Sequence, residues 1–327
     1  MKLKLMPGLD VLKFSMAFLV VAIHAEAVNA YENLYAVIHP LTDIAVPLFF
    51  VISSFLVFSK IRISNNSHEI LQHFLKRLSI LYIFWMLIQF PLVIYTRNYL
   101  NYDIIILPYY IIRDIIFCST FHGSWFLSAL VVGVYIVFFL SKYFTDKYIW
   151  ILPSLISIYI YYYDLFPLNW QYLYHWYTNV FQTPLNSFPV SLIWIVCGYI
   201  LSNSRILKSI SSWNSSALII IFIISWALNI TQSWDMRLCM VLSLFILSFN
   251  WKINYKPIHK YMRQSSILIF ITHFIFISFF RFLFPQIKWL QQGPILYVIL
   301  IISCLITSFI ILKLKDYKIF SWLKYSY

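Results

Sequence analysis

Two ionisable side chains in the first long apolar stretch, Lys13 and His24, have types and spacing that could support chemistry inside a membrane. Eleven positions separate them, so at 100° per residue they lie on nearly the same face of a helix. At 1.5 Å per residue they are roughly 16 Å apart along its axis. Ionisable residues within a span are functional candidates by default, and an imidazole that is neutral near pH 7 can take a proton from a hydroxyl. The structural alternative is a lysine whose amine reaches the membrane surface and a histidine that hydrogen-bonds to a neighbouring helix.

Four further residues have types that could take part in chemistry. His273 is another histidine within an apolar stretch, and Trp125 begins one. Lys76 and Arg77 stand at the entrance of a helix, where basic side chains either anchor the topology or meet phosphate groups. Neither a Ser-His-Asp set nor a Gly-x-Ser-x-Gly elbow is visible, which argues against the chemistry of serine hydrolases.

The composition is that of a protein dissolved in lipid. Hydrophobic residues make up 62% of the 327 positions and charged residues only 11%, whereas soluble domains carry roughly 25% charged residues. The net charge of +13 is best explained by basic cytoplasmic loops rather than by a nucleic-acid partner. The four cysteines are far apart and form no CxxC pair, so neither a disulfide framework nor a zinc site is expected.

Apolar stretches that could span a membrane recur along the whole chain. A spanning helix needs about 20 mainly apolar residues, with a range of roughly 17–25. The sequence therefore predicts an all-α integral membrane protein with about ten spans, and one membrane domain over residues 1–327 with no separate soluble domain. An eleventh stretch, 104–117, is interrupted by Pro108, Arg113 and Asp114 and is predicted to be interfacial or re-entrant. The predicted spans are 10–29, 41–59, 78–95, 125–141, 148–163, 188–203, 214–230, 236–250, 266–283 and 293–313.

Basic residues alternate between the connecting segments in a way that predicts the orientation. With the N-terminus inside, 19 of the 24 Lys and Arg residues fall in inner segments and 5 in outer segments. Cytoplasmic loops carry such an excess, so both termini are predicted to be cytoplasmic. The start of the chain also resembles a secretory signal peptide, with a basic Met1–Lys4, a short apolar run and an A-x-A site at Ala25-Glu26-Ala27.

The two longest outer loops, 96–124 and 164–187, include Arg113 and Trp176, and the second is rich in aromatic residues. Aromatic rings favour the membrane–water interface. They also stack on sugar rings. Both interpretations stay open for these loops.

Six motifs follow one another along the chain: Gly8 to Lys13 followed by ten residues and His24, Pro47 to Leu56, Arg77 with Tyr82 and Trp85, Trp125-Phe126-Leu127, Phe188-Pro189 to Gly198-Tyr199, and Ser265 to His273. Together and in this order they resemble the acyltransferase 3 family of multispan membrane acyltransferases. Two positions depart from the family pattern: Ser54 stands where a glycine is usual, and Phe74 stands where the first of two arginines is often found. The second departure weakens the case for a two-arginine clamp, for which Lys76 could compensate.

The resemblance implies transfer of an acyl group, usually acetyl from acetyl-CoA, to a hydroxyl of a cell-surface glycan. It implies a multi-pass protein of the bacterial inner membrane that binds acyl-CoA as a donor substrate and has no bound cofactor or metal. His24 is then the catalytic residue, with His273 and Asp10 as supporting candidates. Lys13, Lys76 and Arg77 are the candidates for binding acyl-CoA. The candidates for the acceptor loops are Trp125, Arg113 and Trp176.

Non-enzymatic functions remain as alternatives at the level of the sequence. A lipid-linked glycan flippase or a transporter could also be built from ten helices with few intramembrane charges. Transporters often have repeated halves and helices broken by Gly or Pro, and this sequence shows neither and has only 5 glycines. A glycan polymerase is a third alternative, supported only by the long outer loops.

Overall fold

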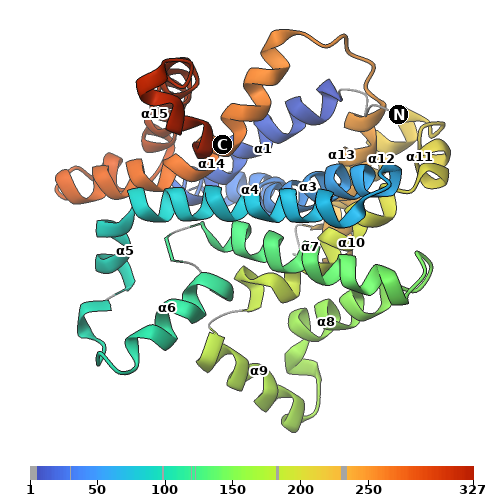
Figure 1. Ribbon diagram of the computed structural model, residues 1–327, viewed down its shortest axis with the longest axis horizontal. Helices are drawn as coiled ribbons and strands as arrows, with labels where there is room; N and C mark the ends of the chain where they lie inside the picture. The colour runs from blue at the N-terminus through green and yellow to red at the C-terminus, as the bar shows by residue number, and fades with distance from the viewer. Residues whose placement is uncertain are drawn as a thin grey trace. The chain divides into compact units, whose positions relative to one another are not determined.

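The computed structural model describes residues 6–29, 31–97, 99–118, 120–121, 123–181, 184–229 and 234–327. In these residues all regular structure is helical, and no strand is found (Figure 1). The basic Met1–Lys4, which resembles the start of a signal peptide, lies outside the described residues. The all-α prediction is therefore confirmed for the described part of the chain.

Six helices among the described residues are long and apolar enough to cross a membrane. A seventh span results if α10 (Phe188–Leu201) and α11 (Ser204–Ile210), which are bent by 85° relative to each other, are counted together. Each of the ten predicted spans contains a helix. Three of these helices are shorter than the six: α8 (Ile151–Tyr161), α12 (Ser215–Leu228) and α13 (Trp234–Asn250). Helix α4 (Ser67–Ile88) begins at Ser67 rather than near 78. The protein is thus a multi-pass membrane protein, while the count of ten stays a prediction. The six long candidates are Pro7–His24, Glu32–Ile63 (α2 and α3 taken together), Ser67–Ile88, Trp125–Tyr143, Pro257–Leu283 and Pro294–Leu314.

The chain divides into two compact units. The central unit comprises residues 53–206, and the terminal unit comprises the described residues of 2–52 and 207–327. Helix α3 (Ala45–Ile63) contributes residues to both. The two units are described separately below.

The central unit is organised around α7 (Trp125–Tyr143), which packs against α4 (Ser67–Ile88) and α10 (Phe188–Leu201). Helix α10 also contacts α8 (Ile151–Tyr161). The predicted interfacial stretch forms α6 (Leu107–Ile116), which at 10 residues is too short to span a bilayer. The central unit also contains α5 (Phe90–Arg97), α9 (Leu168–Phe181) and the first residues of α11 (Ser204–Ile210).

A polar network in the central unit joins the end of α3 to the connection after α7. The guanidinium of Arg62 donates to both carboxylate oxygens of Asp146 at 2.9 and 3.0 Å, and the hydroxyl of Tyr199 donates to the same carboxylate at 2.7 Å. The side-chain amide of Asn203 donates to it at 2.6 Å. Burial acts to raise the pKa of Asp146, but the hydrogen bonds from Arg62, Asn203 and Tyr199 outweigh it and leave that pKa below its usual value. The network therefore favours the ionised carboxylate.

The terminal unit is organised around α1 (Pro7–His24), which packs against α14 (Pro257–Leu283) and α13 (Trp234–Asn250). In Figure 1 the blue α1 and the orange α14 run side by side. Helix α15 (Pro294–Leu314) contacts α14. The terminal unit also contains α2 (Glu32–Asp43), α12 (Ser215–Leu228) and the short 3-10 helix η6 (Lys318–Ser326).

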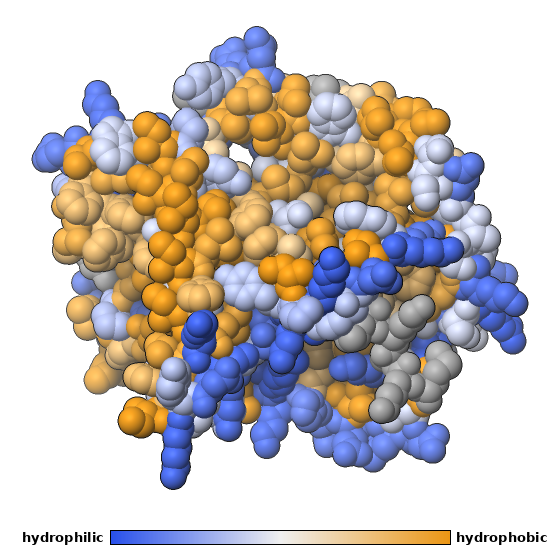
Figure 2. Space-filling model, turned by 90° about the horizontal axis from the view of Figure 1, so that it is seen from above, coloured by the Kyte–Doolittle hydropathy of each residue, from blue (hydrophilic) through white to orange (hydrophobic). Residues whose placement is uncertain are grey.

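Apolar side chains cover much of the surface, as expected of helices that face lipid. Figure 2 shows a broad hydrophobic area on the face in view, with hydrophilic side chains most abundant along the lower margin and others at the top and the sides. On α15 the exposed apolar residues recur every three or four positions and so form a stripe along one side of the helix. A soluble protein rarely exposes so much apolar surface. The stripe consists of Ile295, Val298, Ile302, Ile306 and Phe309.

Candidate functional site

The pairing of α1 with α14 brings the ionisable residues of both helices together. Near the start of α1, a guanidinium nitrogen of Arg263 lies 3.8 Å from a carboxylate oxygen of Asp10. At the end of α1, the rings of His24 and His273 are stacked with centroids 5.3 Å apart. The two helices therefore run parallel, which is the relation that the ten-span prediction requires of its first and ninth spans.

The two imidazoles share an aromatic environment. Their planes are inclined by 24°, and the ring of Phe274 lies 4.4 Å from that of His24 and 4.2 Å from that of His273. His273 is completely buried, whereas His24 is partly exposed. The catalytic candidate of the sequence and one of its supporting candidates thus form a single site, with His24 on its accessible side.

The hydrogen bonding of His273 defines which of its ring nitrogens carries the proton. Its Nδ1 lies 3.0 Å from the carbonyl oxygen of Ile269, one helical turn earlier. A carbonyl oxygen only accepts hydrogen bonds, so Nδ1 is the donor and Nε2 of the neutral ring keeps a lone pair. Nε2 is buried and has no hydrogen-bond partner in the described part of the chain.

The end of α1 is held by backbone contacts that fix the position of His24. The N–H groups of Glu26 and Ala27 bond to the carbonyls of Ile23 and Ala22, which is the pattern of a Schellman motif. Glu26 takes the left-handed position of this motif with φ 52°, where glycine is the usual residue. The N–H of Gly293 donates to the Ala25 carbonyl at 2.8 Å.

An ion pair continues the contact between the helices beyond the histidines. Arg281 of α14 lies 3.4 Å from the carboxylate of Glu26. Gly293, which anchors the adjacent turn, has φ 106°, a value that side-chain-bearing residues rarely adopt. His24 is thus placed by α14 and by the start of α15, and not by α1 alone.

A cationic cluster surrounds Asp10 near the start of α1. Arg263, Lys13 and His259 all act electrostatically on its carboxylate. Lys13 is 8% exposed, and its amine lies 5.6 Å from the centre of the Phe49 ring, so it is largely buried within the protein. The cluster places basic side chains of both helices near the start of α1.

Lys13 and Asp10 both lie well away from His24 along α1. Lys13 and His24 lie on the same helix, and α1 is continuous between them, so the axial separation of roughly 16 Å applies. Asp10 is fourteen residues from His24, or roughly 21 Å along the axis, and its ion pair is with Arg263. Asp10 therefore lies with Lys13 and Arg263 and not beside the imidazole.

Arg263 and His259 are functional candidates that the sequence analysis missed. Arg263 was counted only as a basic residue of an inner segment. A signal was present, because Arg263 precedes His273 by ten positions, much as Lys13 precedes His24 by eleven. The repeated cation-to-histidine spacing becomes meaningful once α1 and α14 are known to be parallel neighbours.

The remaining donor-site candidates lie in the central unit. Lys76 and Arg77 are exposed on α4, which is the surface position required for contact with a phosphate in solution. Further along α4, Tyr82 and Trp85 of the motif that resembles the family are buried. The hydroxyls of Tyr82 and Thr120 are 2.9 Å apart, so this part of the motif has a structural role in the central unit.

The acceptor-loop candidates also lie in the central unit and differ in how they are held. Arg113 forms an ion pair with the fully buried Asp114 at 2.7 Å and lies over the ring of Tyr110. Trp125 is the half-buried first residue of α7. Trp176 on α9 is 55% exposed and is therefore the most accessible of the three candidates for stacking on a sugar ring.

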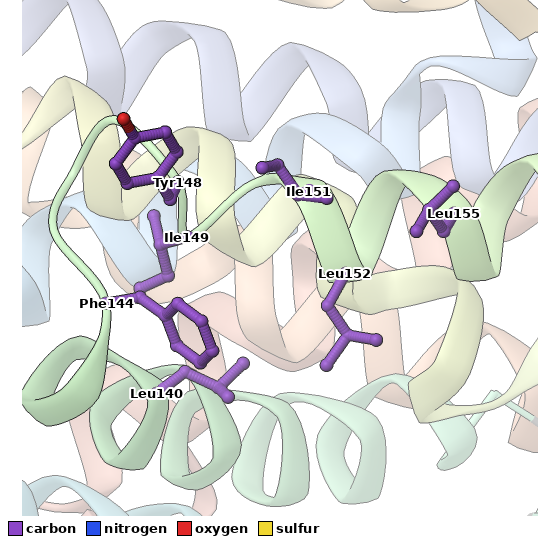
Figure 3. A pocket seen from close by; sticks show the side chains of 7 residues that line it. All are labelled: Leu140, Phe144, Tyr148, Ile149, Ile151, Leu152 and Leu155. Carbon is purple, nitrogen blue, oxygen red and sulfur yellow. The ribbon is translucent and has the colours of Figure 1, made fainter.

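A hollow of about 440 Å³ lies between the end of α7 and α8 in the central unit (Figure 3). Its lining contains no carboxylate, imidazole, amine or thiol, so it offers no group suited to acid–base chemistry near pH 7. It does not compete with the histidine pair as a reactive site. The lining residues are Leu140, Phe144, Tyr148, Ile149, Ile151, Leu152 and Leu155.

Comparison with known proteins shows one match over nearly the whole chain. Residues 6–313 match the family model of an acyltransferase domain. An amino-acid racemase of Enterococcus faecalis is 31% identical over 137 residues, which is 41% of this chain and 18% of the racemase. A second amino-acid racemase of Enterococcus faecalis is 26% identical over 140 residues, 41% of this chain and 19% of the racemase. The chain therefore covers less than a fifth of the length of these relatives, and no solved structure matches it.

Proposed function

Because the chain belongs to the acyltransferase 3 family, we propose that it transfers an acetyl or other short acyl group from acyl-CoA to a hydroxyl of a cell-surface glycan. The family and the apolar helices make it a multi-pass membrane acyltransferase. The proposal adds the donor, the acceptor and a location in the bacterial inner membrane. These follow from the family resemblance of the sequence motifs.

One observation carries the proposal: the α1–α14 pair has basic side chains near the start of α1 and two stacked imidazoles at its end. Lys13 and Arg263 are suited to the phosphates of CoA, since ammonium and guanidinium groups are the side chains that bind phosphate in proteins. His24 lies roughly 16 Å further along α1. A pantetheine arm anchored at the basic side chains could extend towards it, while Lys76 and Arg77 serve as further candidates for phosphate contact.

In the proposed reaction His24 is the general base. Its imidazole takes the proton of the acceptor hydroxyl as the oxygen attacks the thioester carbon. The carbon–sulfur bond then breaks, and the leaving CoA thiolate takes a proton from the imidazolium, so that free CoA and the acyl ester are formed. General-base catalysis of this kind is typically worth about 10²–10⁴ in rate. A nucleophilic His24 that passes through an acyl-imidazole is the alternative mechanism, and it requires one additional intermediate.

The other functions considered for the sequence have less support. The family match favours acyl transfer over a lipid-linked glycan flippase, a transporter or a glycan polymerase. The name of the racemases describes proteins of which this chain matches less than a fifth. Racemisation is therefore not proposed for this chain.

The test uses the full-length protein purified in detergent and incubated with acetyl-CoA and a soluble alcohol as the acceptor hydroxyl, with release of CoA measured by a thiol reagent. His24→Ala and His24→Gln should lower CoA release by about 10²–10⁴ while the protein still inserts into the membrane. His68→Ala is the matched control, because the exposed His68 lies on α4 of the central unit and is not part of the proposed site. A His24→Ala protein that releases CoA at the rate of the unmodified protein would exclude this mechanism.

The acceptor is tested in cells. Mass spectrometry of surface glycans from a deletion strain and from the same strain complemented with the gene should show an acyl group only after complementation. Complementation with His24→Ala should not restore it. Restored acylation in that strain would contradict the proposed role of His24.

A further inference from the structure

The unusual atom of the histidine pair is Nε2 of His273. The side chain is completely buried, Nδ1 donates to the Ile269 carbonyl, and Nε2 has no hydrogen-bond partner in the part of the chain that the structure describes. Thr272, the neighbouring hydroxyl residue, donates to the Leu268 carbonyl at 2.8 Å. Nε2 is therefore a buried acceptor whose donor must come from outside this helix.

A buried acceptor without a donor is unfavourable, because the atom has lost its hydrogen bond to water and gained none in exchange. Native proteins satisfy nearly all such groups. The residues around His273 offer little to Nε2, since its ring contacts are the hydrocarbon rings of Phe270 and Phe274 and the stacked ring of His24. A hydroxyl of a ligand that enters beside the partly exposed His24 would supply the missing donor, and its entry requires the side chains over the buried His273 to move.

The chemistry of the proposed reaction requires that this hydroxyl is a second one. The reacting hydroxyl has a single proton, which His24 removes. Nε2 of His273 therefore needs a different O–H on the same acceptor. Because the two rings are stacked with centroids 5.3 Å apart, the two hydroxyls must be close neighbours on the acceptor.

We propose that His273 is a specificity-determining residue that accepts a hydrogen bond from the hydroxyl adjacent to the one that is acylated. The acceptor is thereby restricted to vicinal diols, such as two neighbouring hydroxyls of a sugar ring, and the hydrogen bond to His273 selects which of the two faces His24. This inference rests on the proposed acyl transfer. It adds the requirement for a diol and a reason for choosing one hydroxyl over the other.

Two substitutions separate this role from a structural one. In His273→Asn the amide nitrogen replaces Nδ1 as a donor to the Ile269 carbonyl, but nothing replaces Nε2. In His273→Gln the longer side chain places an amide oxygen near the position of Nε2, and the donor to Ile269 is lost. A purely structural histidine is better replaced by Asn, and an acceptor-binding histidine is better replaced by Gln.

The experiment compares two soluble acceptors, trans-cyclohexane-1,2-diol and cyclohexanol, with acetyl-CoA and the purified full-length protein. Release of CoA in the absence of alcohol is measured in parallel, and thermal unfolding checks that each variant is folded. The unmodified protein should acetylate the diol at least about tenfold faster than cyclohexanol, which is the effect of one hydrogen bond of about 1.4 kcal/mol. In His273→Asn this ratio should fall close to one, and in His273→Gln it should lie between these values.

Several results would overturn the inference. They are a protein that releases CoA but acetylates both alcohols equally, or acetylates neither, and a His273→Asn variant that keeps the preference for the diol. Retention of that preference by Asn but not by Gln would identify His273 as a structural residue. Absence of any CoA release, with or without alcohol, would instead contradict the proposed function itself, so the two failures are distinguishable.

Discussion

The close approach of α1 to α13 at Gly8 provides a sharp test of how the candidate site is positioned. Gly8 is buried, and a Cβ added to it would lie 2.0 Å from the carbonyl oxygen of Ser248 and 3.3 Å from Cβ of Trp251. Real Cβ contacts are essentially never shorter than 3.0 Å, so Gly8→Ala requires a movement of at least 1 Å. The obstructing atom belongs to the backbone of a neighbouring helix, so α1 and α13 must move apart.

The expected cost follows from this geometry. Overpacking of a tightly packed interior typically costs about 1–3 kcal/mol, and the gain in helix propensity from Gly to Ala is at most about 1 kcal/mol. We expect net destabilisation and a fall in Tm of several degrees. Asp10 and Lys13 are two and five residues further along α1, so the same movement displaces their side chains relative to Arg263. A misplacement of about 1 Å can cost up to about 10² in rate.

Gly133→Ala is the matched control. Gly133 is also a buried helical glycine, on α7 in the central unit, and its added Cβ would lie 2.3 Å from Cδ1 of Ile195. That atom is the end of a flexible side chain that can rotate away, so this substitution should leave stability within about 1 kcal/mol of the unmodified protein. Thermal unfolding in detergent and CoA release from acetyl-CoA are measured for both variants.

The two substitutions should differ in both stability and CoA release. Gly8→Ala should lose both stability and CoA release, and Gly133→Ala should retain both. If Gly8→Ala matches Gly133→Ala in both measurements, α1 does not approach α13 as closely as the structure indicates. The positioning of Asp10 and Lys13 by this contact would then be wrong.

Three further predictions concern other parts of the molecule. Asp146→Asn should destabilise the protein by about 1–3 kcal/mol at pH 7. Because the folded pKa of Asp146 is lowered, this difference should be full above the unfolded pKa of about 3.9 and disappear as the pH falls further, and a difference independent of pH in urea titrations would contradict it. Arg77→Ala should weaken binding of acetyl-CoA in equilibrium dialysis with only partial rescue by Lys, and unchanged affinity would make Arg77 a topology anchor. Tags at residues 66 and 327 should be cytoplasmic and tags at 33 and 168 external in a protease-accessibility assay, and finding 66 and 168 on the same side would disprove the ten-span topology.

Much of the helical structure could be read from the sequence because backbone groups in lipid must be satisfied within a helix. Each predicted span contains a helix, and the spacing of Lys13 and His24 on α1 follows from helix geometry alone. The helix lengths were less predictable. Helix α4 extends into the polar segment from Ser67, where the Asn66 side chain accepts from the backbone N–H of Glu69 and caps it, and α10 is bent away from α11 by 85°.

The candidate site was only partly predictable for a related reason. The sequence identified His24 and His273 as intramembrane histidines, but nothing in it stated that they are in contact. The family resemblance made Asp10 a possible supporting residue, and only the fold shows that it lies beside Arg263. These relations involve residues about 250 positions apart, and no local pattern encodes them.

The sequence by itself determined that this is a helical membrane protein, which residues carry charge inside it, and the family to which it belongs. The tertiary structure alone decided that α1 and α14 are parallel neighbours, that His273 has its lone pair on Nε2, and that Gly8 faces the backbone of Ser248. The physical reason is that lipid is as apolar as the side chains that face it. Hydrophobic periodicity therefore does not reveal which helix packs against which. That choice depends on small residues, polar contacts and shape, and it appears only when the helices are assembled.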